Sequence, residues 1–268
     1  MSAARSLIAL DVDGTLIDAA HRIADRTQRA IAGALDAGVF VVIASARGPA
    51  QLHPIFEQVP RLADGHAVMF QGALVARPDG SAAVTDAPID AMTAEAVASR
   101  CRLAGATLNW FAGEHWHAER RDALVRAEEQ IVESTSTVGV PSGLSPHKLL
   151  AMIAPARTAA LVAVQQQLPV DVHAMRSHPH YLEITKAGVE KGTAVRQLAS
   201  LLAVPPERTA SVGDGENDIS MFAATAHSYA MGNAAASVRA AASQVVPSNE
   251  QDGCAVAIES FIAELHRS

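Results

Sequence analysis

Short apolar runs that alternate with amphipathic stretches along this chain predict an α/β protein. The first apolar run, residues 7–12, breaks off at Gly14 and predicts a buried strand. An amphipathic stretch over 25–37 predicts a helix, and the apolar run 39–44 predicts the next strand. This βα alternation favours a doubly wound, mainly parallel, Rossmann-like sheet, with functional residues at the carboxyl ends of its strands.

One interval in the alternation is long enough to hold a second domain. The stretch from Arg47 to Lys191 is far longer than the dozen or so residues that a crossover needs. We therefore expect a core formed by residues 1–83 and 187–268, with an inserted α/β cap over 84–186. In the cap the pattern predicts helices over 90–103, 122–132 and 157–167, and strands over 107–111, 115–118, 148–153, 171–175 and 181–185. A last helix of the core is expected over 253–266.

Composition narrows the classes of partner. The 268 residues are 49% hydrophobic but only 4% aromatic, so the core must consist largely of aliphatic side chains. The net charge of −7 is spread without acidic or basic blocks, which argues against nucleic acid and anionic membranes as partners. No membrane span, signal peptide or obligate protein partner is evident. Cys101 and Cys254 fall on helical apolar patterns, so we expect reduced core cysteines and a cytoplasmic protein.

Two carboxylates mark the end of the first predicted strand. Asp11 and Asp13 flank the apolar Val12, so the alternation of a strand would turn both toward one side. Carboxylates held this close repel each other unless a cation joins them, and Mg²⁺ is a cation that prefers oxygen ligands. The alternative is that both residues serve only as turn and helix-cap residues.

A second acidic cluster repeats this logic late in the chain. Asp214, Asn217 and Asp218 follow a short strand and a glycine turn, and they open a helix. Acidic groups there could be simple caps, but three polar groups exceed what one cap needs. Ser45 ends another apolar run, and Lys191 stands at a helix start where a nearby anion would explain its charge. These residue types together suit a metal, a phosphate and a nucleophile.

The segments DVDGT, ASAR, KG and GDGEND resemble, in order and spacing, the four signature motifs of the haloacid dehalogenase (HAD) superfamily of phosphohydrolases. YLEITKAGVEKGTAV and MGNA are similar to its Cof-like subclass. The resemblance covers nearly the whole core, whereas the insert matches mainly in length and layout. It implies a Mg²⁺-dependent phosphatase that hydrolyses a small phosphorylated metabolite, either a sugar phosphate or a cofactor-like phosphate. Two alternatives stay open, a phosphomutase acting on a sugar phosphate and a non-catalytic sensor of a phosphorylated ligand.

The resemblance also implies a role for each matching residue. Asp11 corresponds to the nucleophile that forms an aspartyl-phosphate, and Asp13 to the general acid/base, whose backbone carbonyl reaches the metal. Asp218 would orient metal-bound waters from behind the metal ligands. The implied sets are Asp11, Asp13 and Lys191 for catalysis, Ser45, Ala46, Arg47, Lys191 and Asn217 for the phosphate, and Asp11, Asp13, Asp214 and Asp218 for the metal.

Some positions depart from the family pattern or allow two interpretations. Ala46 replaces the usual glycine of the second motif and would resist a left-handed backbone, and Gln71 replaces a usual asparagine. Both changes concern how the substrate is oriented rather than the type of reaction. The cap aromatic residues around Trp110 and Trp116 either form a wall against a substrate ring or pack inside the cap. Asn249 and Asp252 are expected to cap the last helix.

Overall fold

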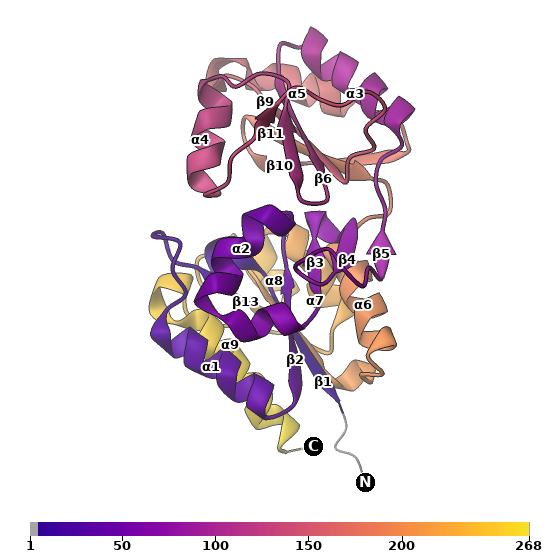
Figure 1. The fold of residues 1–268 in the computed structure, drawn as a ribbon. Helices are drawn as coiled ribbons and strands as arrows, with labels where there is room; N and C mark the ends of the chain where they lie inside the picture. Colours follow the sequence, from indigo (N-terminus) through magenta and orange to yellow (C-terminus); the bar gives the residue numbers. More distant parts are fainter. Residues whose placement is uncertain (1–4, 268) are drawn as a thin grey trace. The chain divides into compact units, whose positions relative to one another are not determined.

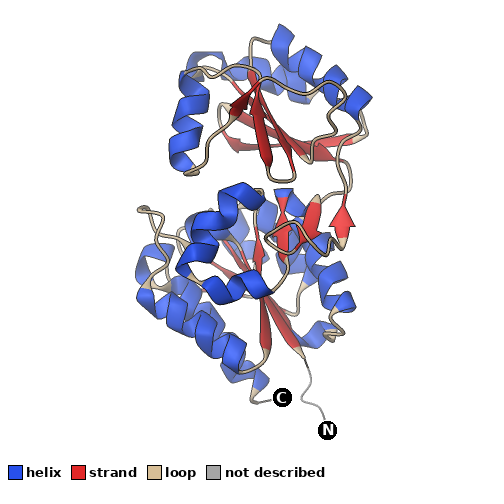
Figure 2. Cartoon of the chain, viewed as in Figure 1, coloured by secondary structure: helices blue, strands red, loops and turns tan. Residues whose placement is uncertain are grey.

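The computed structural model describes residues 5–267 and contains two units (Figures 1 and 2). The first unit includes residues 5–46, 53–84 and 190–267, and the second includes 47–52 and 85–189. In the described part of the chain, no helix is both long and apolar enough to cross a membrane.

The larger sheet has eight strands in the order β14-β13-β12-β1-β2-β3-β4-β5. From β14 to β3 all neighbours are parallel, whereas β3 and β4 form an antiparallel pair. The strand bounds are β1 Ser6–Leu10, β2 Val39–Ala44, β3 Ala67–Met69, β4 Leu74–Ala76, β5 Thr85–Asp86, β12 Thr209–Gly213, β13 His227–Ala230 and β14 Gln244–Val245. The predicted, mainly parallel core sheet is confirmed.

Helices cover both faces of this sheet. They are α1 Asp25–Asp36, α6 Lys191–Leu201, α7 Ile219–Ala224, α8 Ala236–Ala241 and α9 Gly253–Leu265. Helix α2 Pro49–Gln58 follows β2, and its first residues group with the second unit. Figure 1 shows α1 and α9 side by side on one face of the sheet, with α6 on the other. On the α6 face, Val195 and Leu198 pack against Leu7 and Val42 of the central strands in one buried cluster. The aliphatic core expected from the composition is therefore present, and the doubly wound arrangement is confirmed.

The second unit contains a six-stranded sheet in the order β10-β11-β9-β6-β7-β8. Its elements are α3 Ala91–Leu103, β6 Thr107–Ala112, β7 His115–Ala118, α4 Ala123–Ile131, β8 Thr137–Val138, β9 Lys148–Met152, α5 Thr158–Gln165, β10 Val172–His178 and β11 Tyr181–Lys186. Buried residues of α3 and α5, such as Val97 and Leu161, pack with Trp110 and Leu149 on one face of this sheet. Every helix and strand predicted in the insert is present, and β8 is an additional element that the pattern did not predict.

Candidate active site

The candidate site lies where three neighbouring parallel strands end. Leu10 of β1 is in register with Val212 of β12 on one side and with Ile43 of β2 on the other. Asp11 follows β1 and Asp214 follows β12, so the two carboxylates come from adjacent strand ends. In an open α/β sheet this edge is where ligands bind.

The first strand ends earlier than the sequence predicts. β1 stops at Leu10, and residues Val12–Leu16 form a tight turn in which Gly14 has a φ of 76°. The predicted strand over 7–12 is thus two residues too long, because the left-handed backbone of Gly14 bends the chain away from the sheet. A Cβ on Gly14 would lie 2.4 Å from Oδ2 of Asp214, so only glycine fits below that carboxylate. The turn leaves Asp13 exposed, whereas Asp11 is buried.

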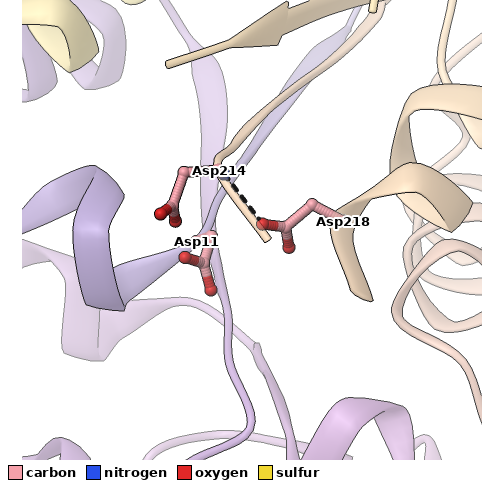
Figure 3. A group of neighbouring side chains, drawn as sticks. All are labelled: Asp11, Asp214 and Asp218. Atoms are coloured by element: carbon pink, nitrogen blue, oxygen red, sulfur yellow. Dashed lines mark hydrogen bonds between the residues drawn. The ribbon is translucent and has the colours of Figure 1, made fainter. Parts of the chain in front are cut away.

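Three carboxylates meet at these strand ends. Asp11, Asp214 and Asp218 each bring one oxygen into a group whose members all lie within 4.8 Å of one another (Figure 3). The ammonium of Lys191, which is only 1% exposed, donates to Oδ1 of Asp11 at 2.6 Å and to Oδ1 of Asp218 at 2.8 Å. The structure therefore brings four of the predicted site residues into direct or near contact, and the acidic groups outnumber the lysine.

The charges in this cluster perturb one another strongly. Burial, and then the negative charge of Asp218, raise the pKa of Asp11 well above its ordinary value. Burial and the same neighbour raise the pKa of Asp214 to about 6. Burial opposes the charged form of Lys191, but the carboxylates of Asp11 and Asp218 outweigh that effect and raise the pKa of the lysine. The site thus keeps a charged lysine and has too much negative charge for one cation to balance.

This donor set fits Mg²⁺. It consists of carboxylate oxygens, the ligands that a hard divalent cation prefers. An additional cation would offset both the burial and the repulsion from Asp218 that raise the pKa values of Asp11 and Asp214. Asp218 already accepts Lys191 at Oδ1, and its Oδ2 accepts the backbone N–H groups of Asp214 at 3.0 Å and Gly215 at 2.9 Å. Asp11 and Asp214 are therefore the better candidates for direct ligands, with Asp218 holding their surroundings in place.

A close helix contact places Lys191 in the cluster. α6 begins at Lys191, and the next residue, Gly192, donates its N–H to the hydroxyl of Ser220 at 3.1 Å. A Cβ on Gly192 would lie 2.0 Å from the backbone oxygen of Ser220. The Lys-Gly pair therefore allows the first turn of α6 to approach α7 closely enough for the ammonium to reach both aspartates.

Gln71 connects two of the predicted phosphate-binding residues. Its backbone N–H donates to the carbonyl of Ser45 at 3.0 Å, and its side-chain oxygen accepts the amide of Asn217 at 3.1 Å. Phe70 and Gln71 have φ values of 51° and 62°, a left-handed conformation that is unusual for two successive bulky residues. The sequence singled out Gln71 only as a departure from the family pattern, and the bond to Asn217 is a finding of the structure.

Ala46 and Arg47 are the residues that follow Ser45 in the second motif. Ala46 has no positive φ, so the strain considered for this alanine does not arise. The guanidinium of Arg47 donates to the carbonyl of Gln51 at 3.3 Å, and residues 47–52 group with the second unit. The contact of Arg47 with a phosphate stays a prediction.

The predicted roles of Asn249 and Asp252 at the last helix are not what the structure shows. Asp252 occupies the N-cap position of α9 with a φ of 59°, but its side chain makes no capping hydrogen bond. The amide of Asn249 donates to the carbonyl of Ile17 at 2.9 Å, and its backbone N–H donates to the side-chain oxygen of Asn233 at 3.1 Å. The cap prediction is wrong, because Asn249 bonds to segments that are distant in sequence and the side chain of Asp252 does not cap the helix. The sequence pattern assigns no role to Asn233, which is part of the MGNA segment.

Aromatic residues of the cap sheet pack within their own unit. Trp110 is 3% exposed and belongs to the cluster under α3 and α5. The indole N–H of Trp116 donates to the side-chain oxygen of Asn109 at 2.8 Å, and the ring stacks on Phe111 with 5.3 Å between centroids. For the two tryptophans, the packing interpretation is confirmed. Cys101 and Cys254 are buried and free, as expected.

Comparison with known proteins extends the resemblance over nearly the whole chain. A family model for haloacid dehalogenase-like hydrolases matches residues 8–258. A phosphoglycolate phosphatase of Halorubrum lacusprofundi is 29% identical over 248 residues, which are 92% of this chain and 93% of that protein. A 5-amino-6-(5-phospho-D-ribitylamino)uracil phosphatase of Bacillus subtilis is 26% identical, over 96% of this chain and 97% of its own length.

A solved structure shows the same fold. The haloacid dehalogenase-like hydrolase from Bacteroides thetaiotaomicron matches with a TM-score of 0.86 at 23% identity, covering 96% of this chain and 99% of the other. The likeness covers the core and the inserted cap alike, so the predicted fold class is confirmed.

Proposed function

Because the chain belongs to the haloacid dehalogenase-like hydrolase family, we propose that it is a Mg²⁺-dependent phosphatase that hydrolyses a small phosphorylated metabolite through an aspartyl-phosphate at Asp11. One observation carries this proposal. A buried carboxylate at a strand end is paired with a buried lysine at 2.6 Å, inside a group of three aspartates. A carboxylate can serve as a nucleophile, and the lysine can hold the phosphoryl oxygens while charge redistributes.

The reaction proceeds in two steps. In the first, an oxygen of Asp11 attacks phosphorus, the bond from phosphorus to the leaving oxygen breaks, and Asp13 donates a proton to that oxygen. In the second, Asp13 takes a proton from water, the water oxygen attacks phosphorus, and the acyl phosphate splits into inorganic phosphate and the Asp11 carboxylate. The exposed position of Asp13 on the Val12–Leu16 turn suits a group that exchanges protons with water.

Mg²⁺ would be held by the carboxylates of Asp11 and Asp214 and by the backbone carbonyl of Asp13, with Asp218 behind them. When bound, it supplies positive charge between an anionic nucleophile and an anionic phosphate. Ser45 and Asn217, joined through Gln71, are our candidates for further contacts to the phosphoryl oxygens. We propose a sugar phosphate or a cofactor-like phosphate as substrate, in line with relatives named for phosphoglycolate and for a phosphorylated ribitylaminouracil. A cytoplasmic location accords with the reduced, buried cysteines.

Phosphate release from a panel of phosphorylated metabolites tests this proposal. We expect release that requires Mg²⁺, stops in EDTA, and falls at least about a thousandfold in Asp11→Asn. Asp36→Asn is the matched control, because the side chain of this aspartate is 69% exposed and forms an ion pair with a surface cation, Arg61, at 2.9 Å. Release that survives EDTA or Asp11→Asn would contradict the mechanism. Formation of an isomeric sugar phosphate without free phosphate would favour the mutase instead.

A further inference from the structure

We propose that Asn233 is a positioning residue that fixes the carboxylate of Asp214 and thereby sets the affinity of the acidic site for Mg²⁺. The inference rests on the proposed metal-dependent function. The side-chain amide of Asn233 donates to Oδ2 of Asp214 at 3.3 Å and to the backbone carbonyl of Gly14 at 2.9 Å. One neutral side chain thus joins the loop that follows β13 to both strand-end turns of the acidic site.

The carboxylate of Asp214 is held at both oxygens. The hydroxyl of Thr15 donates to Oδ1 at 3.1 Å, and Asn233 donates to Oδ2. Beneath the carboxylate lies Gly14, where any side chain would collide with it. Each carboxylate oxygen has two lone pairs, so one neutral donor on each oxygen still leaves acceptor capacity for a cation. Removing one of these donors would let the carboxylate rotate and would add an entropic cost to metal binding.

Asn233 is itself held in one orientation. Its side-chain oxygen accepts the backbone N–H of Asn249 at 3.1 Å, which leaves the NH₂ group directed at Asp214 and Gly14. The loop around it is anchored as well, because Arg239 of α8 donates to the carbonyls of Gly232 and Ala234. The chain therefore fixes both the position of this amide and the direction in which it donates.

This arrangement serves the metal ligand rather than the fold alone. Partners that hydrogen-bond to a ligating carboxylate orient it, and their removal typically lowers metal affinity by about 10–100-fold. Asn233 adds no charge to a cluster that already has excess negative charge, so its contribution is orientation. The bond to the carbonyl of Gly14 alone would be enough to connect the loops, so the bond to the carboxylate of Asp214 is an additional interaction.

Asn249 offers a matched control for this distinction. Its side-chain amide also donates to a carbonyl just after the first strand-end turn, that of Ile17 at 2.9 Å, rather than to Asp214. Asn233→Ala and Asn249→Ala therefore each remove one amide-to-carbonyl bond of equal length from the same region. Asn233→Ala also removes the donor to the carboxylate of Asp214 and the acceptor of the Asn249 N–H.

The experiment is a calorimetric Mg²⁺ titration of the full chain without substrate, combined with denaturant unfolding in EDTA. We expect the Kd for Mg²⁺ to rise about tenfold in Asn233→Ala and less than about twofold in Asn249→Ala. The loss of stability should be larger in Asn233→Ala, because its side chain makes more hydrogen bonds. In phosphate release, Asn233→Ala should need more Mg²⁺ but recover kcat at saturating Mg²⁺, with an unchanged substrate KM. Asn233→Ser provides the same comparison if the alanine variant does not fold.

Each outcome separates this inference from the proposed function. Equal Kd shifts in the two variants would mean that Asn233 supports the loops only, and the inference would fall. A wild-type Kd in Asn233→Ala, in a protein that binds Mg²⁺ and releases phosphate, would also overturn the inference while the proposed function stands. A wild-type protein that binds Mg²⁺ but releases no phosphate would overturn the function and leave the Kd comparison valid. Absence of Mg²⁺ binding in the wild type would overturn both.

Discussion

At the scale of single residues, the site depends on positions that have no side chain as much as on those that do. Gly14 makes room for the carboxylate of Asp214, and Gly192 makes room for the approach of α6 to Ser220. The sequence marks such glycines as turn signals but does not reveal what they approach. Their contribution is therefore visible only once segments distant in the chain are placed together.

Gly192→Ala tests this contribution. A Cβ placed 2.0 Å from the Ser220 oxygen must push α6 away from α7, which would displace Lys191 from Asp11. We expect a loss of about 1–3 kcal/mol in the free energy of unfolding. Phosphate release should fall as well. Gly33→Ala in the middle of α1 is the control, because nothing lies within 4 Å of its Cβ, and it should stabilise by about 0.5–1 kcal/mol. A neutral Gly192→Ala would show that the helices tolerate separation.

At the scale of elements, the sequence predicts those helices and strands whose bounds depend on neighbouring residues. Strand 39–44 coincides with β2, and helix 25–37 differs from α1 by one residue, because apolar periodicity and a closing Gly38 define both. Helix α2 escaped prediction, in keeping with the Pro54 inside it, and β8 has only two residues.

Site residues that belong to a local motif could likewise be predicted, whereas those defined by distant partners could not. Asp11, Asp214, Asp218 and Lys191 were predicted together because their motifs carry them. Asn233 and the bonds of Asn249 were missed because their partners are remote in sequence, with Asn249 bonding to Ile17, 232 positions earlier in the chain. A capping residue and a cross-linking residue look alike in sequence, since the same amide suits either role.

Helix caps of the second unit provide a prediction at this scale. Asp90 accepts the backbone N–H of Thr93 at 2.9 Å and a hydrogen bond from the side chain of the same residue. Asp122 accepts the N–H groups of Leu124 and Val125 and also the hydroxyl of Thr107, which lies on a separate strand. Asp90→Ala should therefore cost about 1 kcal/mol, the usual value for one cap. Asp122→Ala should cost more, since it also leaves a β6 hydroxyl without that partner. Urea unfolding measures the loss in the free energy of unfolding for each variant. A larger loss in Asp90→Ala than in Asp122→Ala would contradict this prediction.

At the scale of the whole molecule, stability and function oppose each other at the strand ends. The chain has a net charge of −7, and its core gathers three carboxylates around one lysine. In the metal-free protein this cluster is unfavourable, because burial first and the negative charge of Asp218 second raise the pKa values of Asp11 and Asp214. Sites that are held ready for a ligand commonly reduce stability in this way, and binding of the ligand restores it.

Asp214→Asn should reveal this opposition directly. In EDTA at pH 7 the variant should be more stable than the wild type, because it removes a carboxylate whose folded pKa of about 6 exceeds its ordinary value of 3.8. A raised carboxyl pKa makes the folded state lose stability as pH rises from about 4 to about 6. The stability advantage of the variant should therefore shrink as the pH is lowered from 7 toward 4.

Adding Mg²⁺ should make the wild type the more stable of the two proteins, since a Mg²⁺ concentration of 100 times Kd stabilises the wild type by about 2.7 kcal/mol. Thermal unfolding of both proteins in EDTA and in Mg²⁺ measures these differences. A Mg²⁺-free buffer of matched ionic strength is the control for general screening. If the variant were less stable in EDTA at every pH, the hydrogen bonds of Asp214 to Thr15 and Asn233 would outweigh its repulsion from the other carboxylates.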